Sequence, residues 1–224
     1  MPAHLLESDE HVRVKTQSSR IVFTPTSDTS GVGLVFFPGA LVDPEAYVPF
    51  AREVAESGFL VIIQKLPWRL APFKSHRLQL FKRTRELLKQ EQSDRKWVIG
   101  GHSKGGALAA EFAANNFTLL SGLLLIGTTH PRERDLSELT IDTVKLVGSK
   151  DGLASPEEVE KFQGLLPQNA TIVLIEGGNH AHFAWYGWQL GDGFATISRE
   201  EQHGKTVEET IRLLSRIASI QPPA

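Results

Sequence analysis

The sequence contains no cysteine and only one methionine in 224 residues. Without thiols the protein has no disulfide bonds, thiolate metal sites or iron–sulfur clusters, and covalent catalysis must use a nucleophile other than cysteine. Positive charge is not in surplus either, because 24 basic residues face 26 acidic ones and the formal net charge is −2. Binding to nucleic acid requires an excess of lysine and arginine to neutralise phosphates. We therefore expect no nucleic-acid partner.

Long hydrophobic runs are also missing. The longest apolar runs, such as residues 59–63, are far shorter than the roughly 20 residues that span a bilayer. Residues 1–20 carry acids among their apolar residues and lack the apolar core of a signal peptide. We therefore expect a soluble, cytoplasmic protein with no membrane partner.

Composition and length are those of an ordinary globular domain. Hydrophobic residues make up 41% of the chain and charged residues 22%, close to the globular average. A chain of 224 residues suits one domain with a sizeable core. We expect that domain at residues 20–220, between a loosely held N-terminal segment at 1–19 and a loosely held tail at 221–224.

Short apolar runs alternate with helical periodicity along most of the chain. Strands are predicted at 34–37, 59–63, 97–99, 123–126, 143–147 and 171–175. Helices are predicted from Asp43-Pro44 to Gly58, over about 74–90, after Ser103, from the capping-box serine Ser155, and over 207–218. This alternation predicts an α/β fold, a mostly parallel central sheet with helices on both faces. Ligands of such sheets bind outside the carboxyl ends of the strands.

A serine flanked by glycines is the most informative motif. Residues 101–105 read Gly-His-Ser-Lys-Gly, with a strand predicted before them and a helix behind them. At such an elbow the serine adopts a strained conformation, and a Cβ two positions before or after it would strike neighbouring backbone. The helix N-terminus also favours developing negative charge. Ser103 is therefore the candidate nucleophile; a solvated serine in a glycine-rich turn is the alternative.

A serine hydroxyl needs a base and an orienting acid, which in hydrolases with this elbow follow the serine in the order acid, histidine. Asp151 stands on a turn just beyond the strand predicted at 143–147. Asp135 and Asp142 precede that strand, and Glu176 sits too close to its own strand to approach a histidine in the following turn. Asp151 is therefore the preferred acid, with an ordinary surface turn as the alternative.

The candidate base follows the last predicted strand. His180 comes directly after a Gly-Gly turn, and His182 lies two residues further on an extended segment. We prefer His180 and keep His182 as its rival. Metal binding by the two histidines is a weak third interpretation, because no further ligand stands nearby in the sequence. No metal site and no cofactor are expected.

Acyl transfer also needs donors for the oxyanion. The elbow supplies the N–H of Lys104, and the second donor is expected in the loop after the first predicted strand, Pro38-Gly39-Ala40-Leu41. Gly39 lets the backbone bend, so the N–H of Ala40 is expected to face Ser103, with that of Leu41 as the fallback and a plain tight turn as the alternative.

Taken together, the segments FFPGALVDPEAYVPFA, GGHSKGG, GSKDG and EGGNHAHFAWYGWQLGDGFATISREEQ resemble an α/β-hydrolase, and more narrowly a family of small, capless α/β-hydrolases related to dienelactone hydrolases. The resemblance implies Ser103, Asp151 and His180 as a catalytic triad, with Ala40 and Lys104 at the oxyanion hole, and it implies no substrate. Dienelactone hydrolases use cysteine as the nucleophile, whereas this chain has serine. Only 15 residues, 128–142, separate the strands between which lidded hydrolases insert a cap.

The expected function is therefore that of a serine hydrolase acting on a small ester or thioester; a binding protein or receptor on the same fold with little turnover is the alternative. Leu41, Trp68 and Trp185 are candidate substrate-binding residues beside the active edge. Four cations after strands are candidates for a positively charged mouth, with solvated surface charge as the alternative: Arg69, Lys104, Arg132 and Lys150. The turn Gly191-Asp192-Gly193 is expected to brace the His180 loop.

Overall fold

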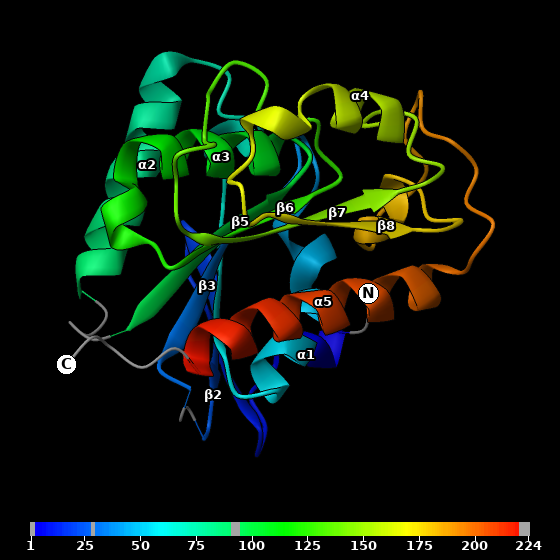
Figure 1. Cartoon of the computed structure of the whole chain (residues 1–224). Helices are drawn as coiled ribbons and strands as arrows, with labels where there is room; N and C mark the ends of the chain where they lie inside the picture. The colour runs from blue at the N-terminus through cyan, green and yellow to red at the C-terminus, as the bar shows by residue number, and fades with distance from the viewer. Residues whose placement is uncertain (1–2, 28–29, 91–94, 220–224) are drawn as a thin grey trace.

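An eight-stranded sheet forms the centre of the computed structural model, which describes residues 3–27, 30–90 and 95–219 (Figure 1). The strands are β1 Val12–Thr16, β2 Arg20–Pro25, β3 Val32–Phe37, β4 Leu60–Gln64, β5 Lys96–His102, β6 Gly122–Ile126, β7 Asp142–Gly148 and β8 Thr171–Ile175. They lie in the order β1-β2-β4-β3-β5-β6-β7-β8. From β4 to β8 every neighbouring pair is parallel. The predicted mostly parallel sheet is therefore confirmed.

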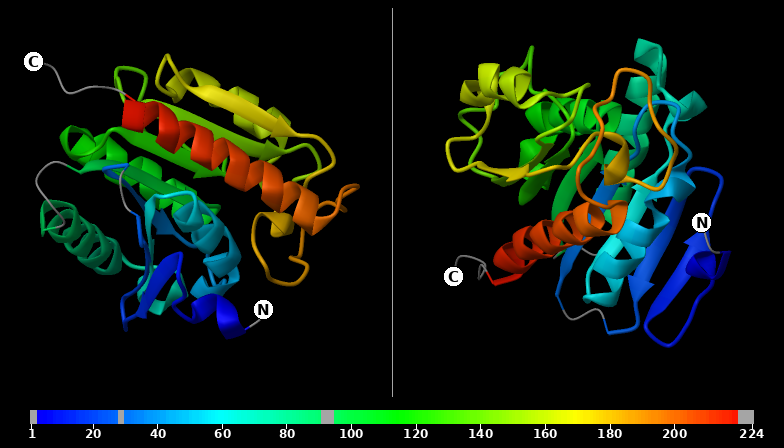
Figure 2. Two further views of the ribbon diagram at one scale, coloured as in Figure 1. Left: turned by 90° about the horizontal axis from the view of Figure 1, so that it is seen from below. Right: turned by 90° about the vertical axis from the view of Figure 1, so that its right-hand side faces the viewer.

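Helices cover both faces of this sheet, as predicted. Their bounds are α1 Val48–Glu56, α2 Lys74–Gln90, α3 Lys104–Asn116, α4 Pro156–Lys161 and α5 Arg199–Ser219, with short 3-10 turns η1 Ala3–Leu6, η2 Pro44–Tyr47, η3 Pro67–Arg69, η4 Phe117–Leu119, η5 Gln163–Leu165 and η6 Ala181–Phe183. Buried side chains of α1 and α5 form one core cluster with the sheet, and those of α2 and α3 form a second. Figure 2 shows α5 and α1 next to each other on one face of the sheet.

The N-terminal segment differs from its prediction. β1 and β2 pair antiparallel with each other, and β2 pairs antiparallel with β4. Val12 is fully buried, and the Arg52 guanidinium donates hydrogen bonds to the carbonyls of Leu5 and Glu7 and pairs with Asp9. The prediction of a loosely held segment at 1–19 is therefore wrong for the residues described, because pairing of β1 with β2 and a buried arginine hold it. The tail at 221–224 lies outside the described residues.

The loops that matter for function meet at one edge of the sheet. β3, β5, β6, β7 and β8 run parallel, so their carboxyl ends lie together. Two sequence signals position the chain near that edge. The Asp43 carboxylate accepts the N–H of Glu45 at the start of η2, and the Ser155 hydroxyl accepts the N–H of Glu158 at the start of α4. Both predicted N-caps are confirmed.

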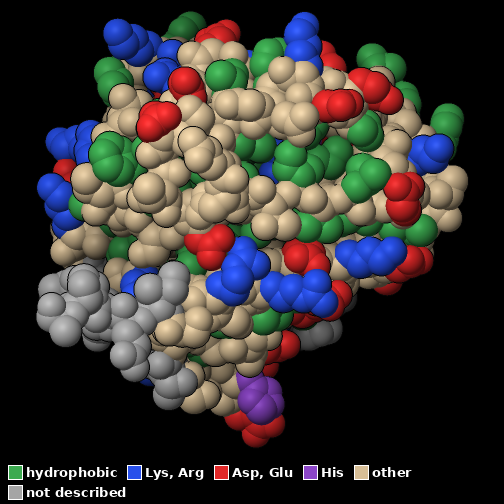
Figure 3. Space-filling model, in the orientation of Figure 1, with side chains coloured by type: hydrophobic (Ala, Val, Ile, Leu, Met, Phe, Trp, Pro, Cys, Tyr) green, Lys and Arg blue, Asp and Glu red, His purple; other side chains and the backbone are tan. Residues whose placement is uncertain are grey.

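Charges of both signs mix on the molecular surface. Figure 3 shows basic side chains beside acidic ones where α5 crosses this face, and Arg212 there pairs with Glu208 and Glu209. Within the described ranges, no helix combines the length and apolar character needed to cross a membrane.

Candidate active site

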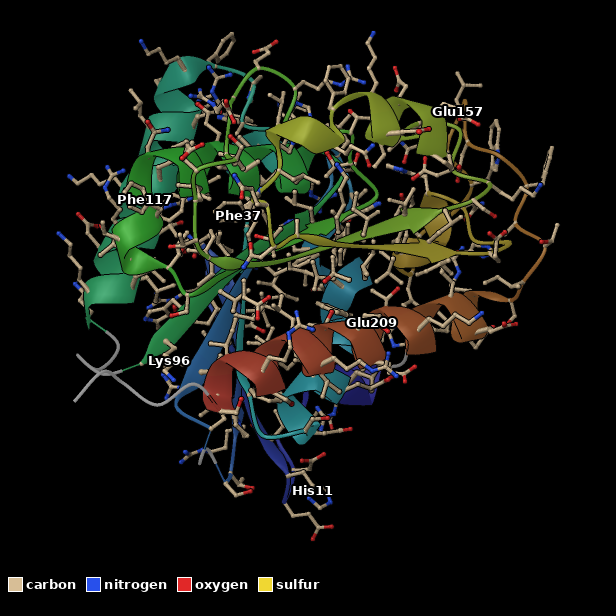
Figure 4. The ribbon with its side chains drawn as sticks, viewed as in Figure 1. His11, Phe37, Lys96, Phe117, Glu157 and Glu209 are labelled. Carbon is tan, nitrogen blue, oxygen red and sulfur yellow. The ribbon has the colours of Figure 1, made fainter. Side chains whose placement is uncertain are left out.

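Ser103 occupies a strained turn between β5 and α3. Its φ of 55° and ψ of −118° lie in a region that side chains rarely adopt. A Cβ at Gly101 would overlap the backbone of Gly105, and a Cβ at Gly105 would overlap the carbonyl of Phe37. Figure 4 shows Phe37 in the interior beneath α3. The two glycines of the motif are thus required because β3, β5 and α3 approach closely at the elbow.

Asp151 and His180 lie in contact, although 28 residues separate them in the chain. His180 Nδ1 lies 2.8 Å from Asp151 Oδ2, and both side chains are almost completely buried. The other carboxylate oxygen accepts the N–H groups of Leu153 and Ala154 at 2.8 and 2.7 Å. One carboxylate oxygen of Asp151 is therefore held by its own turn, while the other orients the imidazole through Nδ1.

The second ring nitrogen of His180 is unpartnered. Nε2 is buried and has no hydrogen-bond partner among the described residues. A cavity of about 280 Å³ is lined by both Ser103 and His180, together with residues of the loops after β6 and β7. The sheet edge therefore brings the predicted serine and histidine to one cavity, with the histidine's acceptor nitrogen free.

The rival residues do not contact the acid–histidine pair. The backbone N–H of His182 donates to Asn179 Oδ1, and its side chain is only half-buried. Asp142 pairs with Arg216 on α5, and Asp135 accepts the N–H of Ser137 in an exposed loop. Among the described residues no group of three or more metal-ligating side chains occurs.

Hydrogen bonds in the loop after β3 distinguish between the two candidate oxyanion donors of that loop, the N–H groups of Ala40 and Leu41. The N–H of Gly39 donates to the Tyr47 hydroxyl at 2.9 Å, and the N–H of Leu41 donates to the Arg69 carbonyl at 2.7 Å. Within the described part of the chain, the N–H groups of Ala40 and Lys104 have no acceptor. The geometry thus leaves Ala40 rather than Leu41 available beside the elbow.

A buried tyrosine–histidine pair beneath the serine was not predicted from the sequence. The Tyr47 hydroxyl lies 2.8 Å from His102 Nδ1. The same hydroxyl oxygen also accepts the N–H of Gly39, so Tyr47 links the oxyanion loop to His102. Burial, and secondarily the nearby His180, lowers the pKa of His102 well below its usual value. The sequence showed a histidine before the serine and an apolar helix position at 47, but no link between them.

Asp192 braces the histidine loop, as the glycine-flanked turn predicted. Its carboxylate accepts the N–H groups of His180 and Ala181 at 3.0 and 2.8 Å. It also accepts the N–H of Gly152, in the turn that carries Asp151, at 3.3 Å. Asp192 is itself buried. One carboxylate therefore ties the His180 loop to the turn that carries Asp151.

The three predicted substrate-binding residues lie outside the described lining of the Ser103 cavity. Leu41 and Trp68 are largely exposed, both at positive φ. The Trp185 ring packs against His203 and Arg199 beside α5. Their role in substrate binding therefore stays a prediction, although none of the three belongs to the described lining of this cavity.

The serine elbow on a parallel sheet, with an acid and a histidine after later strands, defines the architecture of an α/β hydrolase. The model of the alpha/beta hydrolase family matches residues 33–204, so the chain belongs to this family. The connection between β6 and β7, residues 127–141, holds no cap domain. A search of curated proteins finds no match.

Three solved structures with the same fold show low sequence identity to this chain. TT1662 from Thermus thermophilus is 14% identical with a TM-score of 0.68, and the alignment covers 94% of this chain and 100% of that one. Est1E from Butyrivibrio proteoclasticus is 11% identical with a TM-score of 0.67, covering 92% and 100%. A predicted CIB-like hydrolase from Thermoplasma acidophilum is 15% identical with a TM-score of 0.63, covering 90% and 98%. At such identities the likeness concerns the fold alone.

Proposed function

We propose that the protein is a serine hydrolase that cleaves a small ester or thioester through an acyl-enzyme on Ser103. One observation carries the proposal: His180 is held by Asp151 through Nδ1, while its unpartnered Nε2 belongs to the cavity that Ser103 also lines. An orienting acid, a histidine with a free nitrogen and a strained serine are the parts that activate a hydroxyl nucleophile.

In the first half-reaction His180 Nε2 takes the proton of the Ser103 hydroxyl as its oxygen attacks the substrate carbonyl carbon. Asp151 holds the imidazole and stabilises the imidazolium that forms. The carbonyl oxygen becomes an oxyanion, for which the N–H groups of Ala40 and Lys104 are the available donors, at the positive end of α3. Return of the proton from His180 to the leaving alcohol or thiol then breaks the bond to it.

In the second half-reaction water replaces the leaving group. His180 removes a proton from the water as it attacks the acyl carbon, and then returns that proton to Ser103 as the acid leaves. The short connection between β6 and β7 leaves the site open, which supports small molecules as partners. Each step uses only side chains, backbone N–H groups and water.

A fluorophosphonate probe tests the proposal, because it labels only activated serines. We expect stoichiometric labelling of the wild-type protein and none of Ser103→Ala. Ser57→Ala, which changes an exposed serine at the end of α1, serves as the control and should label like wild type. Absence of labelling in folded wild-type protein contradicts the proposal and favours a binding protein on the same fold.

A further inference from the structure

The cavity at Ser103 is lined by cations without acids. Lys104 and Arg132 line it, and among the described residues of its wall none is an aspartate or glutamate. The other two cations predicted at the mouth of the site do not line this cavity. Arg69 pairs with Asp43 at 2.6 Å, and Lys150 is exposed outside the wall. The structure therefore concentrates the positive charge on one side of the serine.

Lys104 is the unpaired cation of this wall. Its ammonium group has no carboxylate partner and no acceptor in the part of the chain that the structure describes, although the side chain is half-buried. Arg132 donates to Glu158 at 3.1 Å, and Glu158 is not a residue of the wall. That contact holds the guanidinium in place beside the cavity. A half-buried ammonium group without a counter-ion favours a bound anion.

A buried basic side chain also lies behind the wall. Lys145 is fully buried and donates from Nζ to the His130 carbonyl at 2.7 Å. Burial, and then the charges of Arg132, Lys104 and Lys145, lower the pKa of His130 to about 4, against a weak opposing effect of Glu133. His130 itself lines the cavity, so the charges of Lys104 and Arg132 both act on one point of its wall.

A second hollow extends the same positive region. It measures about 240 Å³ and shares Lys104, His130 and Arg132 with the Ser103 cavity. On its far side Arg77 and Arg134 share the single carboxylate of Glu111, at 3.8 and 3.0 Å. Glu133 is the other acid that lines it. The hollow thus continues the cationic wall away from the serine.

From this arrangement we infer that the substrate carries a carboxylate, which Lys104 and Arg132 bind while its ester or thioester carbonyl lies at Ser103. The inference rests on the proposed hydrolase function and adds the substrate class. Arginine binds carboxylates with two parallel hydrogen bonds, and lysine supplies a point charge. The cavity, about 280 Å³, lies at the small end of ligand pockets. A short dicarboxylic half-ester or an ester of a small hydroxy acid fits these features.

The test compares esters that differ only in charge. For the acyl side, the pair is mono-para-nitrophenyl glutarate and para-nitrophenyl valerate; for the leaving group, it is the acetate esters of para-hydroxybenzoate and para-hydroxybenzamide. After subtraction of the uncatalysed rate, we expect kcat/KM to favour the charged ester by about tenfold or more in at least one pair. The pair that shows the preference identifies the part of the substrate that bears the carboxylate.

Substitutions then test the two cations. Lys104→Met and Arg132→Gln should each reduce the charged-to-neutral ratio of kcat/KM by about tenfold, mainly through KM, and Arg132→Lys should restore part of it. Lys150→Met, which removes an exposed cation outside the wall, should keep the wild-type ratio. Measuring two substitutions keeps the test valid if one variant does not fold.

Three outcomes separate this inference from the function on which it rests. A charged-ester preference that the Lys104 and Arg132 substitutions abolish supports both. Fluorophosphonate labelling of Ser103 together with equal use of charged and neutral esters in both pairs overturns the carboxylate inference and leaves the hydrolase standing. Absence of both labelling and hydrolysis overturns both.

Discussion

The imidazole ring of His102 lies against that of His180, with the ring centroids 4.5 Å apart and the planes tilted by 44°. A positive charge on His102 would repel the imidazolium that forms on His180 in the proposed mechanism. Burial and the neighbouring His180 keep the pKa of His102 well below its usual value, so His102 stays neutral beneath the reacting groups. The Tyr47 hydroxyl connects this neutral histidine to Gly39 in the oxyanion loop.

Tyr47→Phe is expected to lower kcat by about tenfold with little change in KM, because a small displacement of catalytic groups affects the transition state most. The buried N–H of Gly39 loses its acceptor, so the free energy of unfolding should fall by about 1 to 3 kcal/mol. Steady-state kinetics and urea unfolding measure the two effects. Tyr186→Phe removes a hydroxyl that donates only to Gln189 and should leave kcat unchanged; an equal loss in both variants would contradict a positioning role for Tyr47.

Asp151→Asn and His180→Ala should each reduce kcat by about 10³- to 10⁴-fold, by analogy with serine protease triads. The matched control is His182→Ala, because His182 has a similar place in the sequence but no contact with Asp151. Its kcat should stay close to that of the wild type. Should His182→Ala prove the more damaging change, the base has been assigned to the wrong histidine.

Asp192→Ala should reduce both stability and activity, because it leaves the buried N–H groups of His180 and Ala181 without their acceptor. Each buried donor left unsatisfied costs about 1 to 3 kcal/mol of unfolding free energy. Thermal unfolding and kcat provide the measurements. Asp135→Ala removes an aspartate that accepts an exposed backbone N–H and should change neither quantity noticeably. Wild-type kcat in a folded Asp192→Ala protein would show that the brace is dispensable.

Lys145 makes the stability of the fold depend on pH. Burial, and secondarily Arg132, lowers its pKa from 10.5 to about 7. Between these values the unfolded chain binds more protons than the folded protein, so the free energy of unfolding should rise with pH. The contribution is at most about 1.4 kcal/mol per pH unit. Below pH 7 both states carry the charge, and this dependence ends.

Urea unfolding at several pH values from 7 to 10 measures this slope. Lys145→Met should remove it, whereas Lys89→Met, at an exposed position on α2, should retain it. A slope that persists unchanged in Lys145→Met would mean that the lysine keeps its ordinary pKa in the folded protein.

Much of the fold could be predicted because its signals are local. The strands from β3 to β8 are short apolar runs bounded by turns, and α2 occupies the residues 74–90 that its pattern indicated. β1 and β2 escaped prediction because an edge hairpin buries few residues and is stabilised by β4 and Arg52, which lie far along the chain.

For the candidate site, the residues alone indicated Ser103, Asp151 and His180, because glycine sterics at an elbow and positions just beyond strand ends are properties of short segments. Only the tertiary structure distinguished each candidate from neighbouring residues of the same loop. His180 rather than His182 meets Asp151 because Asp192 holds their loop, and Leu41 is not an available donor because Arg69 already accepts its N–H. These choices depend on contacts between segments that the sequence separates, so no local pattern contains them.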